Sequence, residues 1–208
     1  MTDKLENKVV SFAIIGFGKI GQALARAFAR KGIEVSVATT HDPERFAATA
    51  AAIGPTVIPT TQAEAVKADI IFLAVPFRSH PVIAKALPTW QGKILVDVTN
   101  AYGVSFEELG GRPSACMVAQ AFTGSRLVKG FNHLGAAFLD QDPAVHGGRR
   151  VVFLTSDDDA AAAEIAALAE KLGFSPIKLG ALSEGGLLVQ AQGNSWGQLI
   201  FKDLVKFD

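Results

Sequence analysis

The sequence predicts an α/β fold, with a doubly wound, mainly parallel sheet, helices on both of its faces and a small α/β extension towards the C-terminus. From Val9 to Asn100, short apolar runs alternate with longer segments whose apolar residues recur at helical spacing. The runs are nearly continuous in Val, Ile, Leu, Phe and Ala, which indicates strands covered on both faces. With 208 residues, 49% of them hydrophobic, the chain can bury the core of one full domain.

The first half predicts five strands and a long helix after the first of them. The strands are expected at residues 10–15, 34–38, 56–58, 69–74 and 94–98. The helix is expected at residues 19–31, because Ile20, Leu24 and Phe28 recur at every fourth position and Gly32 can end it. Parallel strands joined by crossover helices follow from this alternation.

The second half continues the pattern without a long linker. We expect a helix at 113–122, strands at 127–131 and 151–155, a helix at 160–172 and a strand at 175–178. Asp157, Asp158 and Asp159 precede the helix at 160–172, and we expect them to cap it rather than to bind a metal. The chain is therefore divided into residues 1–125 and a smaller portion, residues 126–208, packed closely on the first.

The last segment, residues 195–207, predicts an amphipathic helix. Its apolar residues lie three or four positions apart: Trp196, Leu199, Ile200, Leu204 and Phe207. The apolar stripe can close the core or meet a second copy of the chain, and we expect a homodimer.

Composition excludes several kinds of partner and site. Twenty basic and 20 acidic residues give a net charge of zero, so we expect binding neither to nucleic acid nor to a membrane. The single cysteine, Cys116, fits a reducing cytoplasm, and residues 1–8 do not resemble a signal peptide. His80 and His146 have no carboxylate or cysteine at ligand spacing, so no metal site is expected.

A glycine turn between the first strand and the first helix is the strongest functional motif. It comprises Gly16, Phe17, Gly18, Lys19, Ile20 and Gly21, the G-x-G-x-x-G pattern of Rossmann-type dinucleotide-binding domains. Gly16 permits the tight turn, Gly18 lets a pyrophosphate approach the backbone, and Gly21 lets helix and strand pack closely. A turn that binds no ligand would explain one small residue but not all three.

The end of the second strand favours NADP over NAD. NAD enzymes usually place an acidic residue there to bind the ribose hydroxyls, whereas this chain has Thr39, Thr40 and His41, with Arg45 nearby. Two hydroxyls, an imidazole and a guanidinium can bind a 2′-phosphate. The alternative is that the two threonines only cap the next helix.

Two further strand ends should complete the cofactor site, because ligands of open α/β sheets bind at the carboxyl ends of strands. Ala74, Val75, Pro76 and Phe77 follow the fourth strand, and Pro76 and Phe77 would wall the channel for the dinucleotide. Thr99, Asn100 and Ala101 follow the fifth strand, and Thr99 and Asn100 could bind the nicotinamide ribose or amide. Each residue taken singly can also be a simple turn residue.

His133 follows the strand at 127–131 and is the candidate acid or proton donor near the nicotinamide end. The alternative is a structural histidine, which is the more common role.

The chain resembles the NADPH:F420 oxidoreductase family over nearly its whole length. The resembling stretches are residues 14–21, 37–41, 74–77, 96–101, 128–137, 156–160 and 172–183. The resemblance implies a Rossmann domain over residues 1–125 that binds NADP, with residues 126–208 completing the substrate side. It implies that Thr39, Thr40 and His41 hold the 2′-phosphate, and that the nicotinamide stacks on a deazaflavin. The family commonly has arginine at the position of Thr40, so phosphate binding should be weaker here.

On the substrate side the candidate residues are Asn132, His133, Gly135 and Ala136, and Gly135 replaces a proline frequent in the family. The predicted function is hydride transfer between NADPH and a small-molecule ring acceptor, deazaflavin F420 or a flavin. Direct transfer between two rings needs alignment rather than an acid–base pair. The alternatives are a non-catalytic NADPH sensor and a β-hydroxyacid-type dehydrogenase, although the latter would need a large helical domain.

Overall fold

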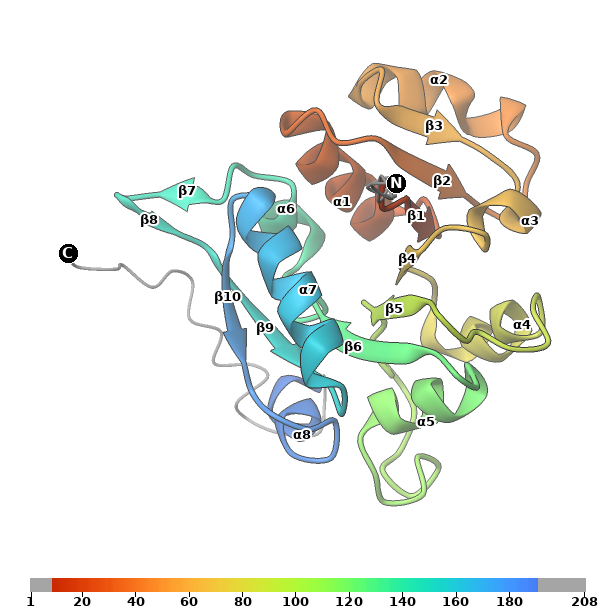
Figure 1. Ribbon diagram of the computed structural model, residues 1–208, viewed down its shortest axis with the longest axis vertical. Coiled ribbons are helices and arrows are strands. Elements are labelled where there is room, and N and C mark those ends of the chain that lie inside the picture. The colour runs from red at the N-terminus through yellow and green to blue at the C-terminus, as the bar shows by residue number, and fades with distance from the viewer. Residues whose placement is uncertain (1–8, 191–208) are drawn as a thin grey trace, which may run out of the picture.

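A central sheet organises the protein, and the computed structural model describes residues 9–190 of the chain (Figure 1). Within that range eight strands form the sheet in the order β10-β9-β6-β5-β4-β1-β2-β3. Their bounds are β1 Phe12–Ile15, β2 Val35–Ala38, β3 Val57–Pro59, β4 Ile70–Leu73, β5 Ile94–Asp97, β6 Arg126–Gly130, β9 Val151–Thr155 and β10 Ser175–Lys178. A separate hairpin pairs β7, Ala144–Val145, with β8, Gly148–Arg149.

Six neighbouring strands of the sheet run parallel, in the order β3, β2, β1, β4, β5 and β6. The strand direction reverses at β9. β9 pairs antiparallel with β6, and β10 pairs parallel with β9. The connection between β6 and β9 therefore stays at one edge of the sheet, where the parallel strands have their carboxyl ends. This connection, residues 131–150, contains helix α6, Ala136–Leu139, and the β7–β8 hairpin.

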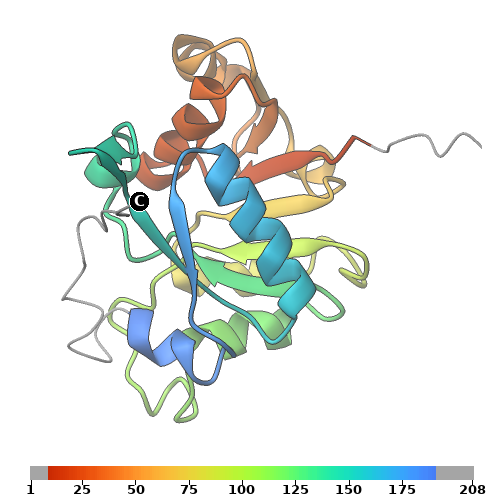
Figure 2. The same cartoon turned by 60° about the vertical axis from the view of Figure 1, so that its left-hand side comes forward.

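One face of the sheet is covered by α1, Lys19–Arg30, α2, Glu44–Ile53, and α7, Asp159–Lys171. Figure 2 shows α7 lying in front of the sheet. A chain of aromatic contacts crosses this core through Phe12, Phe28, Phe72, Phe131 and Phe174, with neighbouring ring centroids 5.4 to 5.8 Å apart. Such ring pairs add to the stability that burial alone gives.

The opposite face is covered by α3, Gln62–Ala65, α4, His80–Ala84, and α5, Ser114–Ala121. A 3₁₀ turn, Phe77–Ser79, leads into α4, and the short α8, Gly185–Val189, packs on β9. The predicted doubly wound α/β fold is thus confirmed, and every strand predicted within the described residues is present within one or two residues of its expected bounds. The amphipathic helix predicted at 195–207 lies outside the described residues.

Capping of α7 is confirmed for one of the three aspartates, whereas the Asp157 carboxylate accepts the Leu182 N–H at 2.9 Å. Asp158 is the N-cap, and its carboxylate accepts a hydrogen bond of 2.8 Å from the Ala161 N–H. Arg126 holds the same carboxylate through Nε at 2.7 Å and Nη2 at 3.2 Å. These bonds lower the pKa of Asp158 to about 2, the Arg126 bond having the largest effect.

Candidate functional site

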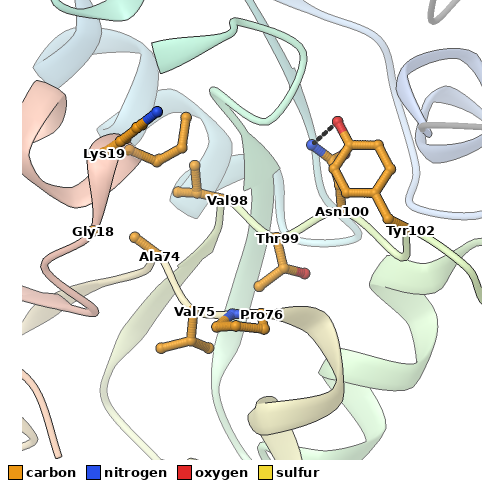
Figure 3. Close-up of a pocket in the computed structure, with 10 residues that line it drawn as sticks. Gly18, Lys19, Ala74, Val75, Pro76, Val98, Thr99, Asn100 and Tyr102 are labelled. Atoms are coloured by element: carbon orange, nitrogen blue, oxygen red, sulfur yellow. Dashed lines mark hydrogen bonds between the residues drawn. The ribbon is translucent and has the colours of Figure 1, made fainter.

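A cleft of about 270 Å³ opens where β1, β4 and β5 end (Figure 3). It is lined by Gly18, Lys19, Ile20, Ala74, Val75, Pro76, Val98, Thr99, Asn100 and Tyr102. Three separate loops contribute these residues, one after each strand. Because β1 lies between β2 and β4 in the sheet, the cleft sits where the strand order reverses, the usual ligand site of such sheets.

The three glycines of the turn differ in what a side chain would meet. A Cβ at Gly16, whose φ is 102°, would lie 2.2 Å from the Ala74 carbonyl oxygen, and one at Gly21 would lie 1.9 Å from the Gly16 carbonyl oxygen. The packing of the protein itself therefore requires these two glycines. A Cβ at Gly18 would meet nothing within 4 Å, so the open space beside Gly18 is not needed by the fold.

The N-terminus of α1 points into the same cleft. The first hydrogen bond of the helix runs from Gln22 N–H to the Gly18 carbonyl oxygen, at 2.9 Å. The N–H groups of Lys19, Ile20 and Gly21 precede it and have no acceptor within the helix. Such groups, with the positive end of the helix dipole, form a binding site for phosphate.

The residues after β2 do not cap the following helix. α2 has Pro43 as its N-cap and no side-chain capping bond. The Thr39 hydroxyl instead accepts the His41 N–H at 2.9 Å and forms a local turn. Arg45 Nη1 lies 3.5 Å from His41 Nδ1, so cation and imidazole share one exposed patch after β2.

The side chains of Thr99 and Asn100, which follow β5, differ in whether they have hydrogen-bond partners. Asn100 Nδ2 donates to the Asn132 carbonyl at 2.8 Å, and Asn100 Oδ1 accepts from Asn132 Nδ2 at 3.0 Å. Figure 3 also shows the longer bond of 3.5 Å from Asn100 to the Tyr102 hydroxyl. The Thr99 hydroxyl is buried and has no partner among the described residues. Thr99 is thus the residue of this loop whose hydroxyl is left for a ligand.

A buried ion pair lies directly behind this loop. Asp97, the last residue of β5, and Lys129 of β6 are 0% and 1% exposed, and Lys129 Nζ lies 3.0 Å from Asp97 Oδ2. Burial lowers the pKa of Lys129, an effect that the charge of Asp97 opposes. Neither residue was predicted as part of the site. Each of them is a charged residue that directly follows apolar residues of a buried strand, and this pattern in the sequence could have identified them.

His133 is not brought to the cleft. Its side chain is buried, its ring lies 4.9 Å from the Phe153 ring, and its Nε2 lies 3.3 Å from the Val151 carbonyl oxygen. Burial lowers the pKa of His133 to about 4, so the imidazole is neutral at pH 7. This placement gives no support to the catalytic role predicted for His133, because the ring is buried and does not line the cleft.

The cleft brings together many but not all of the predicted residues. Gly18, Lys19, Ile20, Ala74, Val75, Pro76, Thr99 and Asn100 line it, whereas the side chains of Phe17, Phe77 and Ala101 are buried in the core. Ala136 lines a neighbouring cleft with Lys19, Gln22, Arg26, Ala137 and Asp140. Gly135 is exposed. Val98 and Tyr102 were missed, and Tyr102 is 66% exposed at the mouth of the cleft.

Residues 9–190 offer neither a metal site nor a membrane-spanning helix. They contain no group of three or more histidine, cysteine or acidic side chains arranged to hold a metal ion. No helix in this range has the length and apolar character needed to cross a membrane.

The sheet order and the glycine cleft define a Rossmann-type nucleotide-binding domain. A family model described as NADP oxidoreductase, coenzyme F420-dependent, matches residues 11–101. The structure of a hypothetical protein from Sinorhizobium meliloti has 34% sequence identity and a TM-score of 0.86, over 96% of this chain and 97% of that one. A candidate F420-dependent NADP-reductase from Arthrobacter has 27% identity and a TM-score of 0.68, over 84% and 86% of the two chains.

Residues 11–101 belong to this family of F420-dependent NADP oxidoreductases, as the sequence predicted. The chain is also 32% identical to rat metalloreductase STEAP3 over 82% of its own length. The chain spans about a third of that metalloreductase, since the match covers 34% of it.

Proposed function

We propose that the chain binds NADP(H) in this cleft and transfers hydride between NADPH and a planar ring acceptor, deazaflavin F420 or a flavin. The observation that carries the proposal is Gly18, a glycine at the start of α1 whose missing side chain leaves open space that the fold does not use. Open space beside unpaired helical N–H groups fits a pyrophosphate, which must approach the backbone closely. The buried, unpaired Thr99 hydroxyl fits a polar group of the nicotinamide half.

The preference for NADP(H) rests on the exposed patch after β2. Thr39, Thr40, His41 and Arg45 place hydroxyls, an imidazole and a guanidinium where NAD enzymes have a carboxylate. Because Thr39 and Thr40 do not cap α2, helix capping does not explain them. Charge-assisted hydrogen bonds from this patch would hold a 2′-phosphate.

The nature of the acceptor follows from what lines the cleft. Bound NADPH would supply a hydride. Among the described residues that line the cleft, Lys19 is the charged one, and it stands at the start of α1, on the pyrophosphate side; the residues after β5 that line the cleft carry no charge. Reduction of a hydroxy-acid or keto-acid pair needs a proton donor and a cation for the carboxylate. Transfer between two rings needs alignment and exclusion of water, which the apolar walls of Ala74, Val75 and Val98 provide.

The test combines binding and turnover. Calorimetry with NADPH and NADH should show that both bind and that NADPH binds more tightly. When the protein and NADPH are mixed anaerobically with F420, FMN, FAD or riboflavin, NADPH should be oxidised, which is followed as a loss of absorbance at 340 nm. Turnover of a keto acid with no ring acceptor reduced would overturn the assignment of the acceptor. Tight NADPH binding without oxidation by any acceptor would instead support a non-catalytic binding module. Light scattering on the same sample tests the predicted homodimer.

A further inference from the structure

The Asp97–Lys129 ion pair has no role in the function proposed so far. The two residues face each other in neighbouring parallel strands, and both are almost completely buried. Removing two charges from water costs free energy that their attraction often fails to recover, and apolar residues of similar volume can serve as well or better. Stability of the fold therefore does not by itself explain the pair.

The hydrogen bonds of the pair indicate what it does. The second carboxylate oxygen of Asp97 accepts the Thr99 N–H at 2.9 Å. Lys129 Nζ, besides contacting Asp97, donates to the Thr99 carbonyl oxygen. Both polar atoms of the Thr99 main chain are therefore held by one charged pair, and all three residues are at most 2% exposed.

Fixing Thr99 matters because of where the residue lies. Thr99 lines the cleft, and its hydroxyl has no partner among the described residues. The next residue, Asn100, is already engaged with Asn132. Because the N–H and the carbonyl oxygen of Thr99 are both held, its hydroxyl can turn towards a ligand only by rotation about the Cα–Cβ bond.

We propose that Asp97 and Lys129 are positioning residues that hold Thr99 so that its hydroxyl binds the nicotinamide half of NADP(H). The inference rests on the proposed function, because it requires the dinucleotide to lie in this cleft. It assigns the two halves of the cofactor to different supports, with the pyrophosphate on α1 and the nicotinamide nucleoside on the loop clamped by the ion pair.

The test compares two probes on parent and variants. NADP⁺ carries the nicotinamide nucleoside, whereas 2′-phospho-ADP lacks both the nicotinamide and its ribose and keeps the contacts of the adenosine half. Removing one charge would leave the other buried and unpaired, so the pair is replaced as a whole in Asp97→Asn/Lys129→Met. The Asp97→Asn change keeps an acceptor for the Thr99 N–H, whereas Lys129→Met removes the donor to the Thr99 carbonyl. Calorimetry measures both dissociation constants, and thermal unfolding confirms that the variant is folded.

The double variant should bind NADP⁺ about tenfold more weakly than the parent, the loss expected for one hydrogen bond, and the fragment with unchanged affinity. Thr99→Val removes the hydroxyl with little change of shape and should cause a similar loss for NADP⁺ alone. Combining it with the double variant should add nothing, because both changes remove the same interaction.

Three outcomes would overturn the proposal. Equal losses for both probes would show that the pair only supports the fold of the cleft. Unchanged affinity for both probes, or additive losses on combination with Thr99→Val, would show that it does not position Thr99. If the folded parent bound neither probe, the proposed function itself would fail, which the parent measurement separates from the other cases.

Discussion

Replacing Gly18 with valine should strongly weaken NADPH binding while leaving the protein folded. A Cβ at this position meets no atom within 4 Å, and the backbone angles, φ −75° and ψ −166°, are extended and open to any residue. The free energy of unfolding should therefore change by no more than about 0.5 kcal/mol, as for an ordinary surface substitution. The new side chain occupies the space that a pyrophosphate needs beside α1.

The expected loss of affinity follows from the N–H groups at the start of the helix. Those of Lys19, Ile20 and Gly21 precede the first helical hydrogen bond, which Gln22 donates to Gly18. A hydrogen bond to a charged group contributes roughly 1.5–3 kcal/mol, so losing two costs about 3–6 kcal/mol. This corresponds to a loss of affinity on the order of 10²- to 10⁴-fold. Gly18→Ala adds one methyl group and should lose less.

The assay is calorimetric titration with NADPH, run beside thermal unfolding, on the parent, Gly18→Ala and Gly18→Val. Gly21→Ala is a matched control of the opposite kind, because its Cβ would lie 1.9 Å from the Gly16 carbonyl oxygen and should destabilise the fold. A folded Gly18→Val variant that binds NADPH as tightly as the parent would refute the reasoning and place the dinucleotide elsewhere.

Three further predictions concern other parts of the chain. The parent should prefer NADPH to NADH by about tenfold to a hundredfold, and Thr40→Asp should reverse this through repulsion of the 2′-phosphate; equal dissociation constants in the parent would show that the patch after β2 binds no phosphate. Because burial holds the pKa of His133 at about 4 rather than 6.5, the folded state binds fewer protons between these values. Stability should fall by up to about 3 kcal/mol as pH drops from 7 to 4, measured by urea unfolding. His133→Phe should lack this part of the pH dependence and keep its hydride-transfer rate at pH 7; a variant that unfolds with the parent's pH dependence, or loses turnover, would contradict this. Asp158→Ala should cost about 1 kcal/mol by removing the cap of α7, whereas Asp158→Ser keeps a cap and should recover most of this loss, since the half-buried pair with Arg126 is still largely screened by solvent. Equal losses in both variants would assign the stability to the ion pair instead.

Local patterns were enough to predict the strands and the glycine turn. β1, β4 and β5 are short apolar runs, and the requirement for Gly21 comes from the carbonyl of Gly16 within the same turn. The reversal at β9 could not be predicted, because Val151–Thr155 is buried along its whole length and is as apolar as the parallel strands, without the alternation typical of antiparallel strands. The two-residue strands β7 and β8 are too short to show a period.

The position of His133 inside the protein follows from the backbone geometry after β6. Phe131, directly after β6, has φ 61°, a left-handed conformation that bulky residues rarely adopt. The rings of Phe72 and Phe174 pack around Phe131 and hold it there. The turn directs Asn132 towards Asn100 and places His133 against Phe153 in the interior. The sequence shows only that His133 follows a strand, so its burial depended on packing between distant segments.

The antiparallel placement of β9 has a consequence for how acceptor choice can change. Because the chain turns back beside β6, residues 131–150 remain at the edge of the sheet that carries the cleft, and they include Ala136, which shares a neighbouring cleft with Lys19. The dinucleotide contacts proposed above come from α1 and from the loops after β2, β4 and β5. An insertion or exchange within residues 141–149 can therefore alter the surroundings of that neighbouring cleft while Leu139 keeps its place in the core and Asp140 its contacts with α1. This segment is the natural place to graft sequence from relatives that reduce other acceptors.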